Sequence, residues 1–179
     1  MENKELFSYG DVLCSRSNSL LSRGIRWFMR IYKHSKITFS HCAVVINLWG
    51  ELWIAEALAW GVRIWSLEQS GYLTNKQTII LRHKQGFSED QVDALSKKIV
   101  SLGGTRYQYE NLPQWIVKIL LKIDIFRKSN ERAIYCSELA AIAIDKAFPG
   151  TFPHPNITSP MDLVESPVFN VIDINNLLA

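Results

Sequence analysis

Four short segments rich in apolar and β-branched residues follow one another in the middle of the chain, with brief connections between them. Segments of this length and composition are typical of β-strands, and the shortest connections suit neighbouring antiparallel strands. The pattern therefore predicts an antiparallel sheet. The four strands are expected at residues 41–48, 51–58, 61–68 and 77–83, and two further strands at 10–15 and 168–173.

Predicted helices stand before and after this group of strands. In the clearest one, 88–102, Ser88 begins a capping box with Gln91, one apolar stripe follows, and a Gly-Gly pair ends the helix. Strands and helices grouped in this way indicate an α+β fold with an antiparallel sheet packed against helices. A chain of 179 residues suits a single domain, 1–179. The other helices are expected at 18–33, 112–124, 136–148 and 159–166.

The composition places the chain among folded globular proteins, because 47% of it is hydrophobic and 21% is charged. The three cysteines are far apart, so they form neither a zinc-ribbon pattern nor a disulfide framework. The first twelve residues contain no apolar run of the kind found in signal peptides. No segment approaches the roughly 20 apolar residues of a membrane-spanning helix. We therefore expect a cytoplasmic chain in a reducing environment at synthesis.

Residues 12–50 contain no acidic side chain, although six basic ones lie there. This charge pattern favours an anionic partner, and peripheral contact with an anionic membrane is one form of it. Nucleic acid is not expected, because no nucleic-acid-binding module is recognisable. The helices predicted at 18–33 and 112–124 are rich in large apolar residues. They either lie at a lipid interface or pack on the sheet and extend their basic ends to water.

Cys136 stands at the start of the apolar helix in AIYCSELAAIAIDKAF. A helix N-terminus has a partial positive charge and free N–H groups, which lower the pKa of a cysteine there and can hold an oxyanion. Taken alone, a single cysteine beside apolar residues is more typical of core packing than of a nucleophile. A nucleophilic thiol also needs a base, and the chain offers four histidines, at 34, 41, 83 and 154.

The predicted hairpin selects His41 among them. If Trp49–Gly50 is a two-residue turn, Ala43 pairs with Glu56, and His41 is then the diagonal neighbour of Glu56 on one face of the sheet. A register shift of one residue would separate them onto opposite faces. The carboxylate would orient the imidazole and stabilise its charged form. Together the residues predict Cys136 as nucleophile, His41 as base and Glu56 as the orienting acid.

Five short segments of the chain, taken in their order along the sequence, resemble those of a known family. The chain is similar to the circularly permuted papain-like amidases of the NlpC type (YiiX/YaeF-like), which are related to lecithin:retinol acyltransferase-like proteins. The matching segments are GDVL, FSHCAVVI, IAEALAWGV, YCSELAAIAI and SPMDL. The resemblance implies a papain-like α+β core with a permuted chain start, and it aligns the catalytic residues of the family with His41, Glu56 and Cys136. It assigns no role to Tyr107, Tyr109 or Glu138.

The expected activity is a Cys-His-Glu hydrolase that attacks an amide or acyl bond through a thioester. The resemblance allows a cell-wall peptide or a lipid-linked acyl group as substrate. The alternatives are a lipid acyltransferase or phospholipase-like enzyme, and a non-catalytic lipid- or peptide-binding module. No cofactor is expected. A metal site built from Cys14, His41, Cys42 and Cys136 is disfavoured, because adjacent strand residues point to opposite faces.

Overall fold

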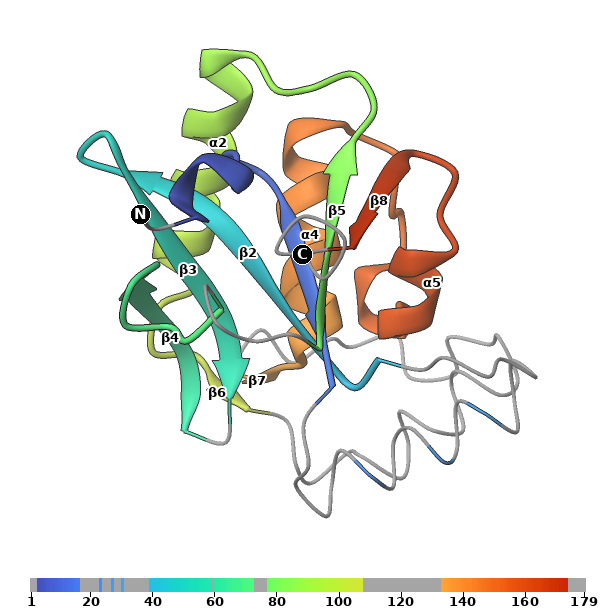
Figure 1. The fold of residues 1–179 in the computed structure, drawn as a ribbon. Coiled ribbons are helices and arrows are strands. Elements are labelled where there is room, and N and C mark those ends of the chain that lie inside the picture. Colours follow the sequence, from blue (N-terminus) through green and yellow to red (C-terminus); the bar gives the residue numbers. More distant parts are fainter. Residues whose placement is uncertain are drawn as a thin grey trace.

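The computed structural model describes residues 3–16, 23, 27, 30, 39–58, 60–72, 77–107 and 133–173. In this part of the chain, six strands form one antiparallel sheet in the order β4-β3-β2-β1-β5-β8 (Figure 1). The expected α+β fold, an antiparallel sheet packed against helices, is therefore confirmed. The strands are β1 (Val12–Ser15), β2 (His41–Leu48), β3 (Glu51–Leu58), β4 (Gly61–Ser66), β5 (Thr78–His83) and β8 (Phe169–Asp173).

The described α-helices that follow the strands also agree with the sequence prediction, whereas the two short 3-10 helices were not predicted. The helix after Ser88 has the expected capping box, with Gln91 N–H donating to Ser88 Oγ and Ser88 N–H donating to Gln91 Oε1. The helix predicted at 112–124 lies outside the described residues, as does most of 18–33. The helical elements are η1 (Asn3–Leu6), α2 (Glu89–Ser101), α4 (Cys136–Ala147), η2 (Pro155–Ile157) and α5 (Pro160–Val164).

A second, two-stranded sheet was not predicted. The two-residue strands β6 (Arg106–Tyr107) and β7 (Ala133–Ile134) lie parallel to each other, next to β4 (Figure 1). The residues just before α4 are thereby tied to the sheet edge formed by β4.

The hairpin between β2 and β3 turns at Trp49–Gly50. Both residues have positive φ, 55° and 81°, as in the tight turns that match the twist of antiparallel strands. From this turn the pairing runs from Leu48 with Glu51 to Ala43 with Glu56, which is the register predicted from the sequence. Glu56 therefore faces the same side of the sheet as Ala43.

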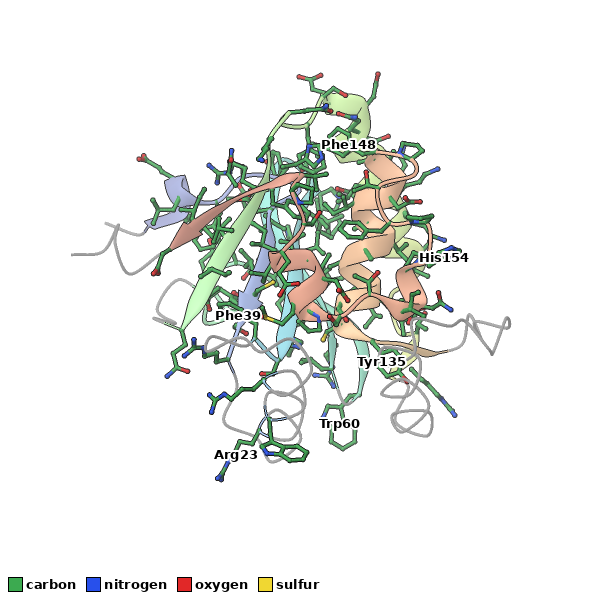
Figure 2. All side chains as sticks on the ribbon, turned by 90° about the vertical axis from the view of Figure 1, so that its right-hand side faces the viewer. Arg23, Phe39, Trp60, Tyr135, Phe148 and His154 are labelled. Atoms are coloured by element: carbon green, nitrogen blue, oxygen red, sulfur yellow. The ribbon has the colours of Figure 1, made fainter. Side chains whose placement is uncertain are left out.

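The two faces of the sheet are buried by different parts of the chain. Helices α2 and α4 cover one face, where Cys14, Cys42 and Val44 pack against Leu139 of α4. Figure 2 shows α4 standing beside the sheet. On the opposite face, side chains of the strands pack with Phe7 after η1 and with residues of the loop after β4. This second cluster comprises Phe7, Leu13, Ala43, Val45, Ile54, Leu67, Tyr72 and Ile80.

An ion pair holds the start of β1 against β5. Asp11 is fully buried and accepts hydrogen bonds from Arg82 Nε at 2.9 Å and Arg82 Nη2 at 2.7 Å. The backbone N–H of Ser8 donates to the same carboxylate at 2.8 Å. The guanidinium of Arg82 therefore balances the charge of the buried Asp11 carboxylate. Among the described residues, no helix combines the length and apolar character that crossing a membrane requires.

Candidate active site

Helix α4 places Cys136 at its first residue. Tyr135 before it is extended, with φ −86° and ψ 161°, and its backbone N–H donates to Glu138 Oε2 at 3.3 Å. Glu138 thus closes the N-terminus of the helix, which agrees with the stabilising effect of an acidic side chain there. Figure 2 shows Tyr135 at one end of α4 and Phe148 at the other. Because the apolar face of α4 is buried on the sheet, Cys136 is fixed close to the end of β2.

His41 is the first residue of β2, and its imidazole meets the carboxylate of Glu56. His41 Nε2 lies 2.7 Å from Glu56 Oε2, and the side chains of the two residues are only 16% and 9% exposed. The two side chains share the sheet face that points away from α4, as the hairpin register requires. Because His41 stands at the very end of its strand, its ring is also able to reach Cys136.

The hydrogen bond between His41 and Cys136 sets the ionisation of both groups. Burial lowers the pKa of His41, but hydrogen bonds and charges from Cys136 and Glu56 outweigh burial and raise this pKa to about 10. Burial raises the pKa of the Cys136 thiol, but His41 and the backbone N–H groups of Cys42 and Ser137 outweigh it, so the net pKa is lowered. The pair therefore favours a thiolate beside an imidazolium.

Sequence reasoning missed Tyr72, which contacts the same carboxylate. Its hydroxyl donates to Glu56 Oε2 at 3.2 Å in a buried setting. Burial, together with the charge of Glu56, raises the pKa of Tyr72 well above its ordinary value, although a hydrogen bond with Ser15 opposes the rise. Tyr72 belongs to a loop without periodic pattern, so only the fold brings it to the site.

The other two thiols face each other on the α4 side of the sheet. Cys14 and Cys42 are directly paired residues of β1 and β2, both are fully buried, and their Sγ atoms are 3.3 Å apart. Burial and the neighbouring thiols Cys14 and Cys136 raise the pKa of Cys42 well above its usual range. Across the described ranges, no three His, Cys, Asp or Glu residues are grouped so as to hold a metal ion.

The remaining histidines lie elsewhere. His83 is buried among aromatic rings at the end of β5 and stacks on Phe148 with 3.7 Å between ring centroids. His154 is exposed before η2, and His34 lies outside the described residues. The main chain of Tyr107 forms part of β6, and Tyr109 is not among the described residues. Of the three histidines that the structure describes, we therefore retain His41 as the candidate base.

No family model matches the chain, and no curated protein matches it in sequence. The fold, however, is YiiX-like: an α+β arrangement in which helices pack on an antiparallel sheet. One solved structure that it resembles is that of the metalloprotein YiiX from Escherichia coli O157:H7, a DUF1105 protein. The two chains are 16% identical, the match covers 92% of this chain and 96% of the other, and the TM-score is 0.66. The likeness supports the fold, and the wider relation to NlpC-type and acyltransferase-like proteins stays a prediction.

Proposed function

We propose that the protein is a cysteine-dependent hydrolase in which Cys136 is the nucleophile, His41 the base and Glu56 the residue that orients the base. The observation that supports this proposal is the position of the His41 ring, which is hydrogen-bonded to Cys136 and, through Nε2, to Glu56 at 2.7 Å. An imidazole between a thiol of lowered pKa and a buried carboxylate has the arrangement that thiol nucleophiles require.

The reaction would proceed in two halves. The Cys136 thiolate attacks a carbonyl carbon, and the His41 imidazolium gives its proton to the departing amine or alcohol. Water gives a proton to the now neutral imidazole and attacks the thioester, which releases the carboxylic acid and restores the thiolate beside the imidazolium. Glu56 holds the ring through Nε2, so the other ring nitrogen serves the reacting groups. The N-terminus of α4 supplies the positive dipole that favours the negative oxygen of each tetrahedral intermediate.

The substrate class is an amide or acyl ester, such as a cell-wall peptide or a lipid-linked acyl group. Exposed aromatic and basic side chains favour a lipid surface as the place of action. Trp60 is 80% exposed and Trp27 is 68% exposed, and Arg23 is exposed as well. Figure 2 shows Arg23 and Trp60 at the same end of the molecule as Tyr135, the residue that precedes Cys136 in the sequence. Tryptophan and arginine together suit peripheral contact with an anionic membrane. Transfer of the acyl group to a lipid acceptor instead of water is the alternative outcome.

The test measures substrate hydrolysis by the full chain and the formation of a covalent acyl adduct on Cys136. A medium-chain acyl ester and a γ-glutamyl-type peptide amide are offered to the wild type, to Cys136→Ala, and to Cys14→Ala as a matched control that removes a buried thiol outside the site. We expect hydrolysis of one substrate class, an acyl adduct on Cys136 in the intact mass, and loss of both in Cys136→Ala alone. Hydrolysis that survives in Cys136→Ala overturns the proposal. Absence of both turnover and adduct with either substrate favours the non-catalytic binding module.

A further inference from the structure

We infer that Tyr72 is a positioning residue for this site: its hydroxyl holds the Glu56 carboxylate in the orientation that supports His41. The inference rests on the proposed function, since it assigns Tyr72 a part in the same device. Tyr72 acts through Glu56 and does not need to touch the substrate.

The first observation is where Tyr72 lies. It ends the described part of the loop after β4, yet its side chain is 5% exposed and packs in the apolar cluster on the sheet face opposite α4. Its neighbours in that cluster include Ala43, Val45 and Ile54. Apolar packing therefore fixes the position of the Tyr72 ring. In this position the Tyr72 hydroxyl donates a hydrogen bond to Glu56 Oε2 at 3.2 Å.

The second observation is that both donors meet on one oxygen. Glu56 Oε2 accepts from Tyr72 Oη at 3.2 Å and faces His41 Nε2 at 2.7 Å. A carboxylate with two donors on one oxygen has little freedom to rotate, and its buried charge is partly compensated. Among the described residues, the hydrogen bonds to this carboxylate come from Tyr72 and His41, so loss of the hydroxyl leaves His41 as its hydrogen-bond partner there.

The third observation concerns the state of the hydroxyl. Burial and the charge of Glu56 raise the pKa of Tyr72 well above its ordinary range, so its proton stays in place at neutral pH. Tyr72 therefore serves as a donor to Glu56 and not as an alternative base. Its hydrogen bond with Ser15 also ties it to β1, where Ser15 is the direct pairing partner of His41. Ser15 of β1, His41 of β2 and Glu56 of β3 thus form one group of hydrogen-bonded side chains with Tyr72.

This arrangement predicts what Tyr72→Phe should change. The ring and its packing remain, but the carboxylate loses the donor that holds its orientation toward His41. A less well oriented carboxylate stabilises the imidazolium less, which lowers the pKa of His41 from its raised value. The imidazolium beside the Cys136 thiolate is then deprotonated at a lower pH, so the basic limb of the reactivity profile moves to lower pH.

The experiment measures alkylation of Cys136 by limiting iodoacetamide from acidic to alkaline pH, with adducts mapped by mass spectrometry on the full chain. We expect the basic midpoint of Tyr72→Phe to fall by about one pH unit, and kcat on the responsive substrate to fall about tenfold with little change in KM. Tyr9→Phe is the matched control, because Tyr9 donates its hydroxyl to the Gly50 carbonyl at 2.8 Å near the far end of the hairpin. Its midpoint should equal that of the wild type.

A second variant keeps the test decisive if Tyr72→Phe folds poorly. Ser15→Ala leaves the Tyr72 hydroxyl in place but removes its hydrogen-bond partner, and it should shift the midpoint in the same direction by a smaller amount. An unchanged midpoint in the folded Tyr72→Phe protein, or in Ser15→Ala where only that variant folds, overturns the inference while Cys136 remains the reactive thiol. If Cys136 alkylates no faster than Cys14 and Cys42 in the wild type, the proposed nucleophile itself is wrong and the inference fails with it.

Discussion

Replacing Glu56 by glutamine removes one negative charge and retains the size of the side chain. The carboxylate is buried, 2.7 Å from His41 Nε2, so its charge acts on the imidazole with little screening by water. The amide still offers an oxygen to His41, which is why the fold should survive. What is lost is the stabilisation of the imidazolium, and with it the stabilisation of the Cys136 thiolate beside it.

The size of the effect follows from that contact. A hydrogen bond between charged groups contributes about 1.5–3 kcal/mol, and a neutral acceptor in the same place recovers part of it. A net loss of about 2 kcal/mol corresponds to about a thirtyfold lower kcat and to a downward shift of about 1.5 pH units in the basic limb of Cys136 alkylation, where the imidazolium is deprotonated. The direction is fixed by charge: removal of the anion lowers the pKa of His41, so the imidazolium beside the thiolate is lost at a lower pH.

The assay compares Glu56→Gln with wild type by iodoacetamide kinetics over pH, and by turnover where a substrate has been found. Glu51→Gln is the control, because Glu51 is exposed at the opposite end of the same strand. Thermal unfolding followed by circular dichroism verifies that both variants are folded. An alkylation midpoint for Glu56→Gln that coincides with that of Glu51→Gln would refute the argument that the carboxylate supports the imidazole.

Three further outcomes follow from the described contacts. Cys14 and Cys42 should remain unalkylated in the native protein, since both are fully buried, and become reactive only after unfolding in urea; labelling of either before Cys136 would contradict this. Arg82→Met should lower the free energy of unfolding by about 3 kcal/mol, measured by urea denaturation, because it leaves the buried Asp11 carboxylate without its cation. Burial lowers the pKa of His83, so the unfolded chain binds the proton more tightly; the free energy of unfolding should fall as the pH drops below about 6.5, and His83→Phe should lessen this fall.

Local chemistry explains why much of the site was predictable. The Trp49–Gly50 turn determines the register of the hairpin, and this register alone places His41 and Glu56 on the same face. The start of α4 could be read from the change to an apolar helical stripe after Cys136. Each of these inferences uses residues close together in sequence, for which rules of turns, alternation and capping hold.

The contacts that were missed join residues through tertiary structure. Tyr72 reaches Glu56 from a loop, and neither its spacing nor its neighbours in sequence carry a periodic signal. The facing thiols of Cys14 and Cys42 depend on which strands are neighbours, which alternation within a single strand does not determine. The β6–β7 pair is likewise defined by two segments of only two residues each.

The candidate site is assembled from one early hairpin and one late helix, and this order has a consequence for the newborn chain. During translation, His41 and Glu56 leave the ribosome together and can pair as soon as their hairpin closes. Cys136 is added long afterwards, and its thiolate is stabilised only when α4 docks against β2. A nascent or half-folded chain therefore has no activated thiol with which to modify itself or its neighbours. Thiol reactivity would appear as the last sign of a finished fold.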